Sequence, residues 1–82
     1  MTKKEKQVCE QMARDGLVYA RECKKYSEKY ERYEKEGDSI KAEIALRYVD
    51  HYGGCVFGIY QTLACLGYKD EIMEELEENL PL

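Results

Sequence analysis

His51, the single histidine of this 82-residue chain, lies one helical turn before Cys55. Side chains four positions apart meet on the surface of a helix, and a thiol beside an imidazole can form a nucleophile. The spacing alone is weak support, because any two residues four apart on a helix meet. The sequence also contains no phosphate-binding glycine loop, no Ser-His-Asp arrangement and no helical His-Glu metal motif. We therefore interpret His51 as a surface or interface histidine beside a small buried thiol, and we predict that the protein is not an enzyme.

The four cysteines, at positions 9, 23, 55 and 65, include no Cys-x-x-Cys pair. The N-terminus is charged and lacks the apolar segment of a secretory signal, so free, buried thiols are the expected state. If the chain folds back near Asp38, Cys9 comes level with Cys65 and Cys23 with Cys55, which leaves two interhelical disulfides as the alternative. A shared zinc site is not expected, because the two levels would be about 20 Å apart. No cofactor is predicted.

A second group of chemically capable residues lies within two helical turns beside Gly53-Gly54, and it consists of Arg47, Tyr48, His51 and Tyr52. A tyrosine can stack on a base, an arginine can hold a phosphate, and glycine lets a ligand approach the backbone. These residues are therefore a candidate ligand groove for a nucleotide, enclosed at the interface of an oligomer. The simpler interpretation, which we prefer, is ordinary helix packing with a surface arginine.

The spacing of apolar residues predicts the elements that position these groups. Between residues 9 and 33, apolar or aromatic side chains recur at alternating steps of three and four, the heptad pattern of a helix packed on another helix. The positions are Cys9, Met12, Gly16, Tyr19, Cys23, Tyr26, Tyr30 and Tyr33. No proline interrupts this segment, because the single proline is Pro81. We predict a helix from about residue 3 to residue 36.

The segment Glu36-Gly37-Asp38-Ser39 is the first strong break. Gly37 suits the left-handed position after a helix, and Asp38 or Ser39 suits the next N-cap. A second heptad pattern then predicts a helix from about residue 39 to residue 66, antiparallel to the first because the connection is short. Its positions are Ala42, Ala45, Val49, Tyr52, Val56, Ile59, Leu63 and Leu66. The pattern continues through Gly53-Gly54, which favours a continuous or kinked helix over a break there.

Gly67 and Asp70 mark a second stop and start. A short acidic helix is predicted from about residue 70 to residue 79, with an apolar stripe of Ile72, Met73, Leu76 and Leu80. Residues 1–82 are thus expected to form a single all-α domain, a long antiparallel helical hairpin plus a short C-terminal helix.

The second predicted helix is apolar on nearly every side, and one hairpin partner plus a short third helix cannot cover all of it. We therefore expect a homodimer or a larger assembly, in which two hairpins pack as a four-helix bundle. Tyrosine suits such an interface, because its ring is apolar and its hydroxyl can remain in contact with solvent. The candidate interface residues are Tyr19, Tyr26, Tyr30, Tyr33, Tyr52, Gly54 and Gly58.

Charged residues make up 37% of the chain and are unevenly distributed. Residues 1–35 contain ten Lys or Arg and seven Asp or Glu, a net charge of +3, whereas residues 36–82 contain three and ten, a net charge of −7. Acids are interleaved with the basic residues of the first helix, so direct binding of nucleic acid is not expected. The most apolar stretch, residues 52–68, is too short for a membrane span, and a cytoplasmic location is expected.

With its short capped hairpin, high charge and acidic helical tail, the sequence resembles small accessory proteins of bacterial phages and mobile elements. The resemblance covers the whole chain without a specific motif, and it implies binding, either to inhibit a host machine or to sequester a signal molecule. We predict a homo-oligomeric helical protein that binds another, unidentified protein. The alternatives are a nucleotide-binding protein with its site at the oligomer interface, and an acidic mimic of nucleic acid built on residues 70–78.

Overall fold

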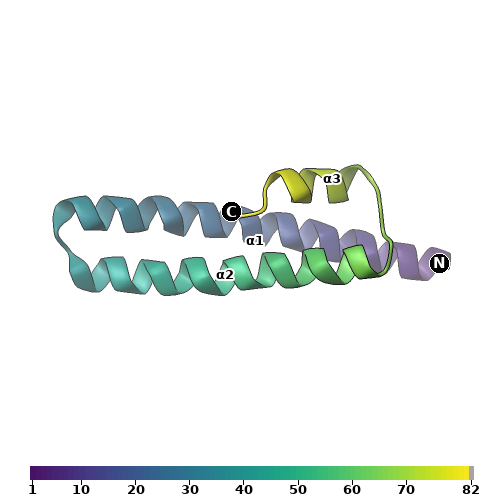
Figure 1. The fold of residues 1–82 in the computed structure, drawn as a ribbon, viewed down its shortest axis with the longest axis horizontal. Helices are drawn as coiled ribbons and strands as arrows, with labels where there is room; N and C mark the ends of the chain where they lie inside the picture. The colour runs from purple at the N-terminus through teal and green to yellow at the C-terminus, as the bar shows by residue number, and fades with distance from the viewer. Residues whose placement is uncertain (82) are drawn as a thin grey trace.

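Two long antiparallel helices and one short helix make up the structure, a computed structural model that describes residues 1–81. The helices are α1 (Lys3–Glu36), α2 (Ser39–Cys65) and α3 (Glu71–Glu78). Figure 1 shows α1 and α2 as a long hairpin, with α3 lying over one half of it. The predicted all-α hairpin with a short C-terminal helix is confirmed. The second and third helices are slightly shorter than predicted, because Leu66, Asp70 and Asn79 are cap residues.

The helix ends are formed by the residues that the sequence marks for them. The Thr2 hydroxyl accepts from the backbone of Glu5 while the Glu5 carboxylate accepts from the backbone of Thr2, a capping box at the start of α1. Gly37 ends α1 at φ 75°, a left-handed conformation that favours glycine. The Asp38 carboxylate then accepts from the backbone of Lys41 and caps α2. Two residues therefore reverse the chain and fix the register of the hairpin.

α2 continues through Gly53-Gly54 without a break, as the heptad spacing predicts. The chain reverses a second time at Gly67, which has a φ of 73°. The Asp70 carboxylate caps α3 through the backbone of Met73 and also accepts from the Tyr68 hydroxyl. Burial and this hydrogen bond raise the pKa of Tyr68 to about 12, so its hydroxyl remains a donor at neutral pH.

The core lies at the open end of the hairpin, where α3 packs mainly against α1. Gly16 lets α3 approach, because a Cβ at this position would lie 3.1 Å from Leu76 Cδ1 and 3.3 Å from Ile59 Cγ2. The largest fully buried side chains are Leu63, Leu76 and Val56. The core consists of Cys9, Ala13, Leu17, Ala20, Val56, Leu63, Met73 and Leu76. Half of these residues are alanine, cysteine or valine, so the apolar volume buried within one chain is small.

Replacement of Gly16 by valine is expected to push Leu76 away and lower the free energy of unfolding by about 1–3 kcal/mol. Urea denaturation followed by circular dichroism measures the change. Gly54→Val is the matched control, because no atom lies within 4 Å of a Cβ at Gly54. Equal stability of the two variants would contradict the packing of α3 on Gly16.

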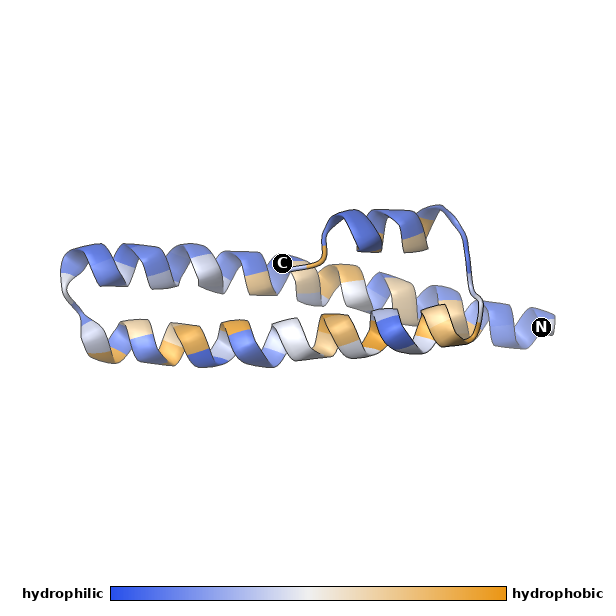
Figure 2. Cartoon of the chain, in the orientation of Figure 1, coloured by the Kyte–Doolittle hydropathy of each residue, from blue (hydrophilic) through white to orange (hydrophobic). Residues whose placement is uncertain are grey.

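The loop end of the hairpin, residues 24–50, is only two helices thick. Figure 1 shows that α3 and the C-terminus stop near the middle of α1. Figure 2 shows hydrophobic residues along much of α2, including the part that α3 does not reach. Ile40, Ile44 and Tyr48 are 73%, 51% and 44% exposed, whereas the buried contacts of α2 here are the small Ala42 and Ala45. The apolar surplus predicted for the second helix is therefore present on a single chain.

Candidate functional site: the tyrosine face

One side of the hairpin carries a row of large apolar side chains that α3 does not cover. Met12, Tyr19, Tyr26 and Tyr33 recur at intervals of seven, so they occupy one side of α1. The α1 residues packed in the core beside α3 include Ala13 and Ala20, each one position further and thus about 100° around the helix. We call the uncovered side the tyrosine face and define it by Val8, Met12, Tyr19, Tyr26 and Tyr33 of α1 with Ile44, Tyr48, Tyr52 and Leu66 from α2 and its cap.

Four tyrosine rings form a stacked row across the two helices. The Tyr26 and Tyr48 ring centroids lie 4.6 Å apart with an interplanar angle of 20°. Tyr52 stacks on Tyr26 at 5.9 Å and on Tyr19 at 6.0 Å. Stacked pairs at these distances stabilise a structure beyond the area that they bury. All four side chains remain partly exposed, so the row is both a contact between the helices and a surface.

At the loop end, cations surround these rings. Lys25 Nζ and Lys29 Nζ lie 5.4 and 5.1 Å from the centroid of Tyr26, and Arg32 and Lys41 lie 5.0 and 5.8 Å from that of Tyr33. A hollow of about 210 Å³ opens between them, which we call the loop-end pocket. Its lining contains no acidic side chain and consists of Tyr26, Lys29, Tyr33, Lys41, Ile44, Ala45 and Tyr48. The chemistry of the pocket is aromatic and cationic.

At the open end, the same face has a different character. A hollow of about 450 Å³ lies between the start of α1 and the end of α2, and its lining includes Val8, Met12 and Leu66. Val8 is 54% exposed and Leu66 55% exposed, and the polar groups around them are those of Thr2, Lys4 and Glu5. The heptad pattern places Leu66 in the interface between the helices, but α2 ends at Cys65 and Leu66 points outward as its cap.

The structure brings most of the predicted interface residues together. Tyr19, Tyr26 and Tyr52 form the stacked row, and Tyr33 lines the loop-end pocket. Tyr30 is half-buried and belongs to none of the ring pairs among residues 1–81. Gly54 and Gly58 are exposed, and a Cβ at either would meet no atom within 4 Å.

The residues of the predicted ligand groove separate into two groups. The His51 ring lies edge-on against Tyr52 at 5.1 Å, and Tyr48 stacks on Tyr26. The Arg47 guanidinium instead pairs with Glu43 at 3.0 Å, and its side chain is 78% exposed on the outer side of α2. Burial raises the pKa of the Tyr52 hydroxyl, and the carboxylate of Glu22 acts in the same direction, so this hydroxyl stays neutral and able to donate.

Ile44, Lys29 and Lys41 are functional candidates that were not among the predicted site residues. Ile44 could be identified from the sequence, because an isoleucine outside the heptad positions of the second helix has no partner helix within the chain. The two lysines carry no such signal, since Lys41 approaches Tyr33 only after the chain has reversed. Val8 and Leu66 come together for the same reason.

All four cysteines are free. Cys9 and Cys23 are buried, Cys55 is half-buried and Cys65 is exposed. Burial, with a contribution from Asp50, raises the pKa of the Cys23 thiol, which also donates to the carbonyl of Val49. Within residues 1–81, no hydrogen bond joins His51 to Cys55, and no cluster of His, Cys, Asp or Glu could hold a metal ion.

Alkylation by iodoacetamide, read by mass spectrometry, is expected to follow the exposure of the thiols. Cys65 should react first and Cys55 next, with Cys23 slower than Cys65 by more than about tenfold because its thiolate is scarce and its sulfur is covered. A Cys55 that reacts faster than Cys65 would contradict this order. It would indicate activation of Cys55 by His51.

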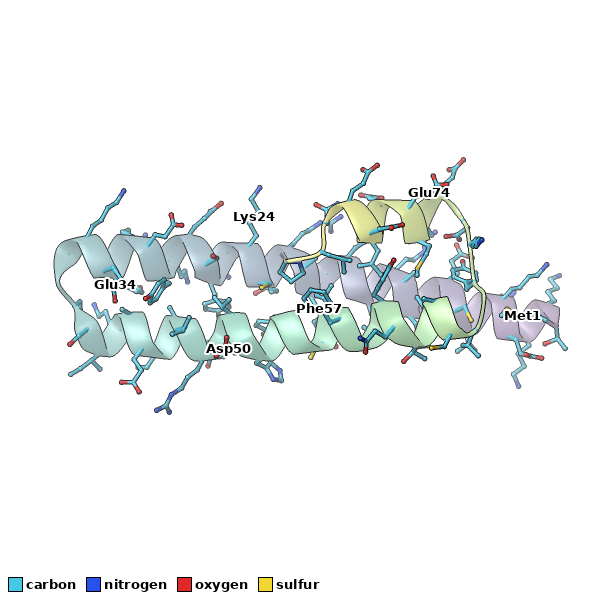
Figure 3. All side chains as sticks on the ribbon, viewed as in Figure 1. Met1, Lys24, Glu34, Asp50, Phe57 and Glu74 are labelled. Carbon is cyan, nitrogen blue, oxygen red and sulfur yellow. The ribbon has the colours of Figure 1, made fainter. Side chains whose placement is uncertain are left out.

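Another hollow, of about 570 Å³, lies where the α3 layer stops. Its floor includes Leu17, Ala20 and Cys23, and Arg21 and Lys24 lie opposite Glu75 at its edge. Lys24 projects outward from α1 in Figure 3, and Glu74 projects outward from α3. The edge is mixed in charge, in contrast to the loop-end pocket.

Comparison with family models, with curated protein sequences and with solved structures finds no match to this chain. No described helix is both long enough and apolar enough to cross a membrane.

Proposed function

We propose that the protein is a non-enzymatic helical interaction module that pairs with a second copy through the tyrosine face and, as a dimer, binds another protein. The observation that carries the proposal is the exposure of Val8, Ile44, Tyr48 and Leu66, each at 44% or more, along one side of the hairpin. The half-buried Met12, Tyr19 and Tyr52 lie between the two exposed ends, and an apolar surface of this extent usually marks an interface.

The dimensions of the tyrosine face support a second copy as its occupant. The molecule extends 52 × 17 × 16 Å, and the tyrosine face, from Val8 to Tyr33 on α1, is about 37 Å long. A stable interface buries about 800 Å² on each partner, and each fully buried Ile or Leu side chain contributes about 1.5–3 kcal/mol. Two hairpins that meet on these faces form a four-helix bundle, with α3 of each copy on the outside.

Tyrosine is well suited to such an interface. Its ring is apolar, and its hydroxyl can remain at the solvent-exposed edge of the interface. The hydroxyl therefore keeps its hydrogen bond to water on pairing. The rings are already stacked within each copy, which lowers the entropy cost of ordering them on association. These features favour pairing over a closed core of four tyrosines in one chain.

The acidic side of α3 supports the binding of a further protein. Glu71, Glu74, Glu75, Glu77 and Glu78 are exposed and form no ion pair within residues 1–81. This side lies outside the proposed pair and would face a basic surface of the partner, with inhibition as one result of binding. Electrostatic complementarity of this kind raises association rates.

The geometry favours protein binding over nucleotide binding at Arg47, Tyr48, His51 and Tyr52. Tyr48 stacks directly on Tyr26, which leaves no gap for a base between them. Arg47 pairs with Glu43 on the outer side of α2, away from the loop-end pocket. We expect a thermal-shift series with mono-, di- and cyclic nucleotides to be flat.

The protein-binding part of the proposal is tested with matched baits. The immobilised protein and its Glu74→Lys/Glu77→Lys variant are exposed to lysate of the source cell, and retained proteins are identified by mass spectrometry. The proposal expects a protein that the unaltered bait retains and the variant loses. Retention of the same proteins by both baits, or of none, overturns this part.

A further inference from the structure

We propose that the two copies pair in antiparallel orientation about a twofold axis, so that the loop end of one tyrosine face lies on the open end of the other. This arrangement rests on the proposed pairing and specifies its geometry. The twofold axis crosses the hairpin at its middle and runs perpendicular to its length. Two properties of the tyrosine face support this orientation, namely its charge and the size of its α2 side chains, and both vary along its length.

The loop end of the face is cationic. Lys25, Lys29 and Lys41 lie within cation–π distance of Tyr26 or Tyr33, and the loop-end pocket has no acid in its lining. Lys25 and Lys41 have carboxylates at 3.8 Å, those of Glu22 and Asp38. Lys29 forms no ion pair in the described part of the chain. Its charge is therefore available to a second chain.

The open end of the face carries the carboxylate of Asp15. Asp15 lies three residues after Met12 and seven after Val8, so it occupies the same side of α1 as these two apolar residues. Asp15 is exposed, and among residues 1–81 its carboxylate accepts only from the amide of Gln11. Glu5 lines the open-end hollow, where Lys4 is the opposing charge. The facing half of α2, residues 53–66, has no charged side chain.

The antiparallel pair brings these two ends together. α1 and α2 overlap from the hollow near Cys9 and Leu66 to the turn at Gly37, so the middle of the overlap lies near Glu22. Asp15 and Lys29 are each seven residues from Glu22, and a perpendicular twofold axis at that level exchanges them. Two Asp15–Lys29 pairs result, and Glu22, which lies at the axis, has its charge paired with Lys25 of its own chain. A parallel pair would instead place Lys29 against Lys29, which like charges disfavour.

The shape of α2 supports the same arrangement. Steps of three and four place Ile44, Tyr48, His51, Cys55, Gly58, Thr62 and Leu66 on one side of this helix. The row is bulky at Ile44 and Tyr48, small from Cys55 to Thr62 and bulky again at Leu66, and a Cβ at Gly58 would meet none of the described atoms within 4 Å. Glycine in a helix costs about 1 kcal/mol relative to alanine, and no contact within the chain accounts for that cost. In the antiparallel pair, Ile44 and Tyr48 of each copy lie over the small stretch from Cys55 to Thr62 of the other.

Cysteine cross-linking tests the direction of pairing, in a protein that carries Cys55→Ser and Cys65→Ser so that the half-buried and exposed thiols are removed. Lys29→Cys and Asp15→Cys are introduced into separate chains of different tag length. We expect a disulfide between the Lys29→Cys and Asp15→Cys chains in a glutathione buffer, and little cross-linking of Lys29→Cys alone. An efficient disulfide between two Lys29→Cys chains overturns the antiparallel arrangement.

A charge exchange gives an independent readout by sedimentation at low salt. Lys29→Glu is expected to weaken the dimer about tenfold, and Asp15→Lys in the same chain is expected to restore it. If the dissociation constant falls with Lys29→Glu, or does not return to its original value with Asp15→Lys, the antiparallel arrangement is overturned and the pairing itself is left intact. An unaltered protein that sediments as a monomer overturns the pairing, and the arrangement with it.

Discussion

Replacement of Ile44 by aspartate is expected to weaken self-association by at least about a hundredfold, because Ile44 is half exposed on the single chain and the pair would bury two copies of it. The substitution removes the apolar contact and introduces a charge that must lose water on pairing, although Lys29 and Lys41 of the same pocket lie near enough to pair with it. The dissociation constant from sedimentation equilibrium measures the effect.

Leu46→Asp is the matched control for this variant. Leu46 is 40% exposed on the same helix, and two positions along α2 turn its side chain to the opposite side. The control should leave the dissociation constant within about threefold of the unaltered protein. Equal effects of the two substitutions would contradict pairing through the tyrosine face. A monomeric Ile44→Asp variant with unchanged helix content would show that the hairpin itself does not require the pair.

The second large effect is expected from Leu76→Ala, which should lower the free energy of unfolding by about 2–5 kcal/mol. Leu76 is fully buried and occupies the space beside Gly16, so truncation leaves a cavity under the middle of α3. Because few other large side chains hold α3, its amide protons should also exchange faster with deuterium.

Glu77→Ala is the control for Leu76→Ala, since Glu77 is the next residue of the same short helix and is exposed. Its effect on the free energy of unfolding should lie within about 0.5 kcal/mol. If Leu76→Ala were as mild as this control, α3 would not be anchored through Leu76. The account of the open-end core would then be wrong, whereas the account of the tyrosine face would be unaffected.

The sequence predicts the helices well because their boundaries depend on local chemistry. Gly37 can adopt the left-handed conformation, Asp38 and Asp70 can cap, and these properties do not depend on the rest of the fold. The continuity of α2 through Gly53-Gly54 could be predicted from the heptad phase. The position of α3 could not, because Gly16 accepts Leu76 only where a third helix crosses α1, and spacing along one helix does not show this crossing.

The tyrosine face could be predicted in part. The spacing of Tyr19, Tyr26 and Tyr33 places them on one side of α1 without any tertiary information. Their stacking partners depend on the register of the hairpin, which the two-residue connection fixes, so the Tyr26–Tyr48 pair is a result of folding. The positions of Lys29 and Lys41 beside these rings, and of Leu66 beside Val8, follow from the same register.

The most direct test of the central claim is sedimentation equilibrium of the unaltered protein from low to high micromolar concentration. The account predicts a species of twice the mass of the chain, which dissociates on dilution while its helix content decreases only slightly. A well-folded species with the mass of one chain at high micromolar concentration would contradict it. The exposed tyrosines, Ile44 and Leu66 would then be stable in water, and their exposure would no longer indicate a partner.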